Sequence, residues 1–117
     1  MPYNIHGMAH SFLIFNFGGD EDAAQQGRLR IEGWKQGFRL DKKLQFKFDR
    51  KAGSKSEGKA EVVMIVRLDF SEHEKLSHQR WMERIPTEES FNAANPKVIL
   101  PGDPQFAKTD ELFDSLD

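Results

Sequence analysis

Cysteine is absent from the 117-residue chain, and this absence removes several kinds of site. Disulfide bonds, iron–sulfur clusters, zinc sites with thiolate ligands and a cysteine nucleophile are all excluded. No apolar run approaches the about 20 residues that a membrane-spanning helix needs, and the N-terminus lacks the pattern of a signal peptide. We therefore expect a cytoplasmic protein without a membrane partner.

A large excess of one charge is also lacking, because the formal net charge is −2. Such a balance indicates no class of partner. The charge is distributed unevenly, however, since residues 42–59 carry seven basic and two acidic side chains, whereas residues 103–117 carry five acidic side chains and one basic one. Hydrophobic residues make up 38% of the chain and include ten phenylalanines, which is enough apolar volume for one globular core.

Two apolar runs predict the central strands of a sheet. In residues 60–70 (AEVVMIVRLDF), positions 62–66 are all apolar and mostly β-branched, which favours a strand over a helix. Residues 8–17 (MAHSFLIFNF) have four successive apolar side chains at 12–15. Unbroken apolar runs of this length are typical of strands with both faces buried.

Two weaker segments predict edge strands. Residues 44–49 alternate apolar and polar side chains and contain Lys47, as expected for a half-buried edge strand. The polar residues 51–59 between this segment and the central run predict a mobile hairpin loop. Residues 97–100 (KVIL) predict a short fourth strand that ends at Pro101-Gly102.

The first helix is predicted at residues 21–37. Apolar side chains recur there at three- and four-residue spacing, and acidic residues stand at its start, where they favour the free N–H groups. Three glycines within the span weaken the prediction. The competing interpretation makes residues 28–33 a strand.

The second helix is predicted to begin near Ser71. Glu74 follows at capping-box spacing, and Pro86 should end the helix because proline cannot continue it. Leu76 lies off the apolar stripe of this helix. The alternative is a start at Ser77, with Leu76 before the helix and packed back on it.

The element order is strand, helix, strand, strand, helix, strand. This order is typical of the ferredoxin-like split βαβ fold, an α+β fold in which a four-stranded antiparallel sheet carries two helices on one face. The first and third strands lie in the middle of that sheet. We expect a single α+β domain at residues 1–102 and an acidic C-terminal tail, docked or disordered, at residues 103–117.

Two helices leave the second face of such a sheet without a cover. Because both central strands look apolar on both faces, we expect a homodimer through the open sheet face, or the tail folded across it. The fold serves many unrelated functions and therefore identifies none. The residues resemble no particular family.

Histidines and a glycine pair are the candidates for a metal or phosphate site. His6 and His10 share a strand face but would lie ~13 Å apart, too far for one metal ion, and His73 and His78 diverge on a helix. Gly18-Gly19 stands where a phosphate loop would, but it lacks a Walker lysine and is followed by acids. Those acids could hold Mg²⁺, although water-facing helix-start charges are the expected role. We predict no metal and no cofactor.

The basic stretch offers a nucleic-acid surface, because lysines neutralise phosphates and the neighbouring aromatics could stack on bases. The candidate contacts are Lys43, Lys47, Lys51, Lys55 and Lys59. The alternation of residues 44–49 puts the phenylalanines in the core, so the lysines can equally be an ordinary solvated edge.

Residues Leu112, Phe113 and Leu116 of the tail form a short amphipathic turn. They could dock into a groove on another protein. The alternative is that they pack on their own domain.

Three classes of function therefore remain from the sequence. The favoured one is a small cytoplasmic binding or assembly module, expected to be a homodimer. The second is a nucleic-acid-binding module that uses the basic hairpin. The third is an enzyme with a pocket between helices and sheet and a histidine or carboxylate as its acid–base group.

Overall fold

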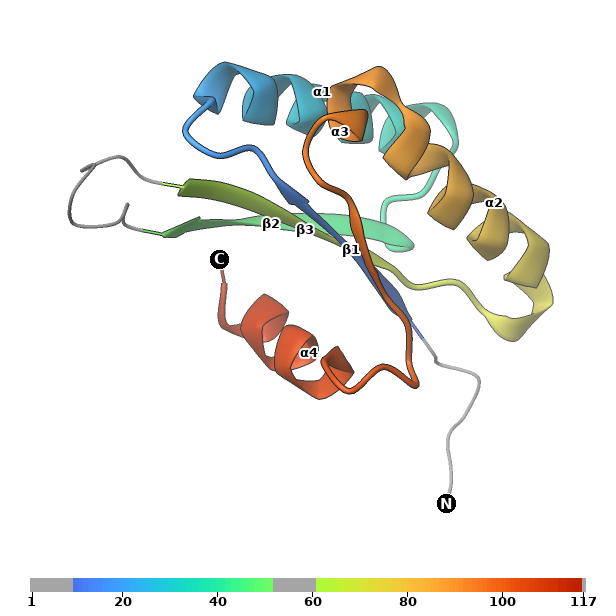
Figure 1. The fold of residues 1–117 in the computed structure, drawn as a ribbon. Helices are drawn as coiled ribbons and strands as arrows, with labels where there is room; N and C mark the ends of the chain where they lie inside the picture. The colour runs from blue at the N-terminus through green and yellow to red at the C-terminus, as the bar shows by residue number, and fades with distance from the viewer. Residues whose placement is uncertain (1–9, 52–60, 117) are drawn as a thin grey trace.

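The computed structural model describes residues 10–51 and 61–116. They form an α+β fold with a four-stranded antiparallel sheet (Figure 1), which confirms the α+β class and the antiparallel sheet of the prediction. The elements are β1 (Ser11–Asn16), α1 (Glu21–Gly37), β2 (Leu44–Lys51), β3 (Glu61–Leu68), the 3-10 turn η1 (Glu72–Glu74), α2 (Lys75–Thr87), α3 (Glu89–Asn92), β4 (Lys97–Ile99) and α4 (Phe106–Ser115). None of the described helices is long and apolar enough to cross a membrane.

The strands lie in the order β2-β3-β1-β4, and each neighbouring pair is antiparallel. The two apolar runs of the sequence are therefore the middle strands β1 and β3. Their register pairs Leu13 with Val66 and Phe15 with Met64, and all four side chains are buried. The amphipathic segment becomes the outer strand β2, and the short segment becomes the outer strand β4.

Both faces of the sheet are covered, as Figure 1 shows: α1, α2 and α3 lie on one face and α4 on the other. The helical layer and its face of the sheet share a large core that includes Leu13, Phe15, Trp34 and Phe91. A smaller core on the opposite face is made by Phe12, Val63, Ile65, Ile99 and Phe113. Alternation along β1 explains the division, because successive side chains of a strand point to opposite faces.

α1 begins where the sequence predicted and excludes the strand alternative, because residues 28–33 lie inside the helix. The side chain of Asp20 caps it by accepting a hydrogen bond from the Ala23 amide at 3.0 Å. Gly27 is needed for close packing. A Cβ there would lie 3.0 Å from the ring of Phe91 and 3.1 Å from the ring of Phe17.

α2 departs from the prediction at both ends. Ser71 and Glu74 do form a capping box, but the first turn is a 3-10 turn and the α-helix starts at Lys75. The helix also continues past Pro86 to Thr87. Pro86 removes the N–H that would bond the Met82 carbonyl, and only one helical residue follows it. The Thr87 hydroxyl donates a 2.8 Å hydrogen bond to the Arg84 carbonyl, one of the carbonyls at this helix end.

Candidate functional site

The predicted nucleic-acid lysines do not form one described surface. Lys43 forms an ion pair with Glu74 at the start of α2, whereas Lys47 donates a 2.8 Å hydrogen bond to the Phe113 carbonyl at the end of α4. Lys51 ends β2, and Lys55 and Lys59 lie outside the described residues. The two lysines whose side chains are described thus serve contacts within the chain. The Lys43 ammonium, with the Ser71 hydroxyl, lowers the pKa of Glu74 to about 2.

The tail residues pack on their own domain. Phe113 is fully buried in the smaller core, and Leu112 and Leu116 pack against that core. The guanidinium of Arg67 lies 4.6 Å from the Phe113 ring centre and the ammonium of Lys47 lies 4.5 Å from it. Two cations at the C-terminal end of α4 also favour its dipole. These apolar side chains therefore pack within their own chain, as the alternative interpretation of the sequence predicted.

No hydrogen bond or ring contact joins two histidines within the described residues. His10 pairs with Asp110 of α4 at 3.1 Å and contacts the rings of Phe12 and Phe106, while His6 lies outside the described residues. Across residues 10–51 and 61–116, no group of three or more histidine or acidic side chains is placed to hold a metal ion.

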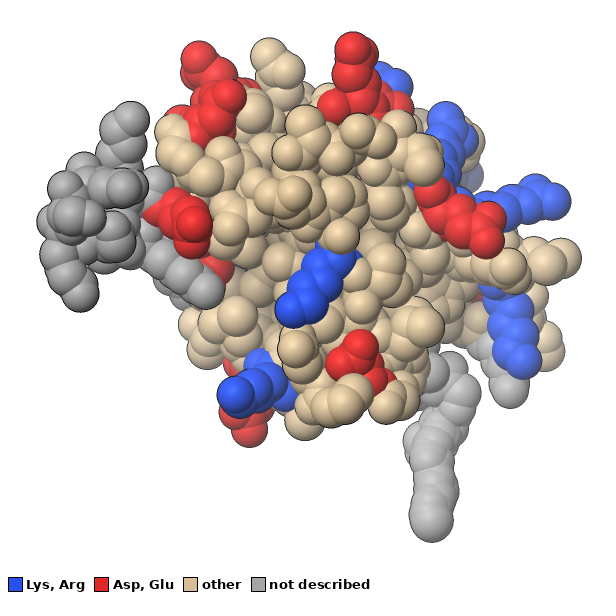
Figure 2. Space-filling view, viewed as in Figure 1, with Lys and Arg blue, Asp and Glu red and all other residues tan. Residues whose placement is uncertain are grey.

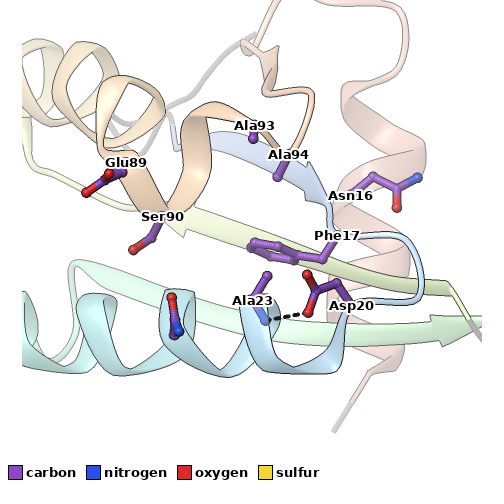
Figure 3. A pocket seen from close by; sticks show the side chains of 9 residues that line it. Asn16, Phe17, Asp20, Ala23, Glu89, Ser90, Ala93 and Ala94 are labelled. Atoms are coloured by element: carbon purple, nitrogen blue, oxygen red, sulfur yellow. Dashed lines mark hydrogen bonds between the residues drawn. The ribbon is translucent and has the colours of Figure 1, made fainter.

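Asp20, the first acid after the glycine pair, lines a cavity of about 220 Å³ between α1 and α3 (Figure 3). Gly18 has a φ of +60°, and its amide donates to the Asn16 side chain at 2.8 Å. The Phe17 ring lies between the two helices, and the Asp20 carboxylate turns back to the Ala23 amide. Glu89 and Asp20 make this cavity acidic, which is unfavourable for phosphate.

A second cavity of about 230 Å³ lies between α2 and the ends of β1 and β4 and is lined partly by Ser11, His78, Met82 and Leu100. The His78 ring stacks on Phe70, and its buried Nε2 has no hydrogen-bond partner among the described residues. Burial lowers the pKa of His78, and the Asp69 carboxylate opposes that change. Both cavities are smaller than the about 300–1,000 Å³ of typical ligand pockets.

The two cavities lie near opposite ends of β4, and the surface between them carries little charge. Residues 90–102 contain one charged side chain, Lys97, in a chain with 31% charged residues. Figure 2 shows the corresponding area over α3 and β4, where uncharged side chains predominate and one basic side chain lies near the middle. Val98 is 45% exposed and Leu100 50% exposed within this area. We call the open edge of β4, together with the side chains of Pro96, Val98 and Leu100, the β4 surface.

Backbone directions show which groups this edge offers. The Asn16 amide of β1 donates to the Ala94 carbonyl, whereas the Phe17 amide donates to Val62 in β3. Because backbone groups of successive strand residues point to opposite sides, Phe12 and Ile14 also face β4.

Their register partners Ile99 and Lys97 therefore face β1, and Val98 directs its N–H and C=O to the open edge. No strand of the described ranges, 10–51 and 61–116, pairs with that edge. The β4 surface thus combines open hydrogen-bonding groups with exposed apolar side chains.

No model of a known protein family matches the chain, and no curated protein shows significant similarity to it.

Sequence reasoning identified the short fourth strand but missed the β4 surface. The available signal was the nearly uncharged stretch 90–102, which ends in an apolar segment between two prolines. Low charge at a predicted edge strand is unusual, because edges are commonly protected by charged side chains.

Proposed function

We propose that the protein is a small binding and assembly module that associates with another polypeptide through the β4 surface. The observation that carries the proposal is the half-exposed pair Val98 and Leu100 on an open strand edge, within a stretch, residues 90–102, whose one charged side chain is Lys97. Depletion of charge is the compositional mark of the centre of protein interfaces. An open edge adds backbone hydrogen bonds to a partner in extended conformation.

The second face of the sheet is less suited to this role. The sequence predicted a homodimer through that face, because two helices would leave it without a cover. α4 now lies there and buries Phe12, Ile65 and Ile99, so a partner on that face would have to displace α4. Binding at the β4 surface requires no such rearrangement. The homodimer stays a prediction, and we now place its interface at the β4 surface.

For the fold we propose the ferredoxin-like class. The proposal is supported by the element order, by the position of β1 and β3 in the middle of the sheet, and by α1 and α2 on one face. α3 and α4 are additions to that pattern. Because this fold carries many functions, the class adds no weight to the proposed activity.

A selection from a random-peptide phage library tests the proposed function. The immobilised protein should select peptides in extended conformation, and Val98→Asp should abolish their binding because it puts a charge in the middle of the apolar edge. Leu76→Asp is the matched control, since Leu76 is a 70% exposed leucine on α2 outside the β4 surface. Selected peptides that bind the Val98→Asp variant as well as the wild type would refute the proposal.

A further inference from the structure

We propose that the occupant of the β4 surface is a second copy of this chain, with the β4 strands of the two copies paired antiparallel about a two-fold axis at Val98. This inference rests on the proposed function and specifies its partner. A pair of this kind is isologous, so the same surface must complement itself in hydrogen bonding, shape and charge.

Hydrogen bonding at the axis is self-complementary. Val98 directs both its N–H and its C=O outward, so the Val98 residues of the two copies can donate to each other reciprocally. Such a hydrogen-bonded pair closes the centre of an antiparallel ladder without leaving either group unpaired.

Complementarity continues one step from the axis, where Leu100 of one copy stands opposite Pro96 of the other. The alternation directs the Leu100 N–H to the open edge, where it can donate to the Pro96 carbonyl. The reverse bond would need an N–H on Pro96, which proline lacks, and a free Leu100 carbonyl. That carbonyl already accepts a 2.8 Å hydrogen bond from the Asp103 amide. The proline that would block an ordinary partner therefore faces a carbonyl that needs no donor.

Side chains on the helical side of the sheet agree with this pairing. Val98 lies opposite Leu13, whose side chain belongs to the core under the helices, so Val98 points to the same side. In the pair, Val98 would pack on its symmetry mate and Leu100 on Pro96 of the second copy, so that exposed apolar surfaces cover each other. Lys97 points to the α4 side, where its flexible stem allows its ammonium to stay in water.

The cavities at the two ends of β4 are lined by side chains of opposite charge, and Asp103 lies close to the Leu100 end. The cavity at one end is lined by Asp20 and Glu89, and the cavity at the other end is lined by Lys75. An antiparallel two-fold brings the acidic cavity of each copy toward the Lys75 side chain of the other. Opposite charges at the rim favour this register over a parallel one.

The other open edge, β2, is the competing surface for a second copy. The Asp69 amide donates to the Lys43 carbonyl, so the alternation directs the backbone groups of Phe46 and Phe48 outward. Charged groups accompany them, because Lys35 lies over the Phe46 ring and Arg50 over the Phe48 ring. Association there would have to desolvate or displace these cations, so β4 is favoured.

A charge-swap experiment on the full chain tests the inference. Val98→Asp and Val98→Lys are prepared separately, and sedimentation equilibrium is measured for the wild type, for each variant and for their equimolar mixture. The wild type should dimerise, and each variant should dissociate with an increase in Kd of at least about 100-fold, because position 98 faces itself and like charges repel. The mixture should recover dimers, since a carboxylate then faces an ammonium. Unchanged circular dichroism of each variant serves as the folding control.

Three results would overturn the inference: a wild type that stays monomeric at high concentration, a dimer that persists in both charged variants, or a mixture that stays dissociated. A monomeric wild type whose selected peptides still depend on Val98 would remove only the second copy as partner and leave the proposed function standing. A dimer that persists with charge at position 98 would direct attention to the β2 edge.

Discussion

The two open edges of the sheet differ in how they limit unwanted pairing with other strands. β2 runs over eight residues and offers outward backbone groups, but Lys35, Lys47 and Arg50 place charge around it. β4 runs over three residues between Pro96 and Pro101 and has little charge near it. Length and charge are both devices that limit unwanted strand pairing. We infer that an edge protected by shortness alone can pair with a partner whose hydrogen-bonding pattern fits it.

We expect the largest effect from a substitution that loosens α4, the helix that covers the second face of the sheet. Phe113→Ala should destabilise the protein by about 3 kcal/mol, because a fully buried ring leaves the smaller core. Release of α4 would expose Phe12 and Ile65, and this apolar face should then produce larger species than either edge does. Denaturant unfolding and sedimentation velocity measure the two effects. Unchanged stability would show that α4 contributes little to the fold.

Proline substitutions compare the two edges directly. Val98→Pro removes an outward N–H from β4 and should raise the dimer Kd by about 10- to 30-fold, since the two reciprocal bonds are lost and each is worth about 1 kcal/mol. Arg50→Pro removes an outward N–H from β2 and should leave the Kd unchanged. Neither change removes a bond to a neighbouring strand, so both variants should stay folded. Equal effects of the two prolines on the Kd would contradict the preference for β4.

Two glycine substitutions in α1 test how closely this helix packs on α3, the helix that precedes β4. Gly27→Ala should destabilise the protein by about 1 kcal/mol, because its Cβ would press on the Phe91 ring of α3, the helix that precedes β4. Gly33→Ala is the matched control in the same helix. No atom of the described residues lies within 4 Å of its Cβ, and alanine favours the helix, so stability should rise by up to about 1 kcal/mol.

Thermal unfolding of both glycine variants checks these signs. A gain in stability for Gly27→Ala would show that the contact between α1 and α3 is looser than described.

The smallest expected effect concerns the ion pair beside the start of β2. The Lys43 ammonium, together with the hydroxyl and the amide of Ser71, lowers the pKa of Glu74 from 4.5 to about 2, so the folded state favours the ionised carboxylate. This contribution to stability is complete above pH 4.5 and is lost as the pH falls toward 2. Glu74→Gln should flatten that part of the stability profile, and Kd should not change at pH 7. An unaltered acid profile in denaturant titrations would exclude this pair as its cause.

The sequence predicted the fold wherever local patterns and tertiary packing agree. β-branched residues at 62–66 and the apolar run at 12–15 could only be satisfied by burial on both faces, and the structure places them in the middle of the sheet. The end of α2 was predicted too early, because the lost N–H of Pro86 weakens the helix without requiring it to stop at the residue before the proline.

The site could be predicted less well, for a geometrical reason. The amphipathic pattern of Leu112, Phe113 and Leu116 predicts an apolar helix face, but it does not say whether that face covers its own sheet or another protein. The direction of the Val98 backbone groups depends on the register of β4 against β1, and side-chain patterns do not report it. Surfaces made of backbone groups leave only an indirect trace, here the scarcity of charge.

A single introduced cysteine provides the most direct measurement of the pairing at Val98. The chain has no native cysteine, so Val98→Cys supplies the sole thiol, and Arg50→Cys on β2 and Leu76→Cys on α2 are matched controls. In a hydrogen-bonded antiparallel pair the Cα atoms lie about 5.5 Å apart, within the range that a disulfide can bridge. The account predicts rapid oxidation of the Val98→Cys variant to a disulfide-linked dimer, far ahead of both controls, in non-reducing electrophoresis. Equal rates for the three variants, or a faster rate for Arg50→Cys, would contradict it.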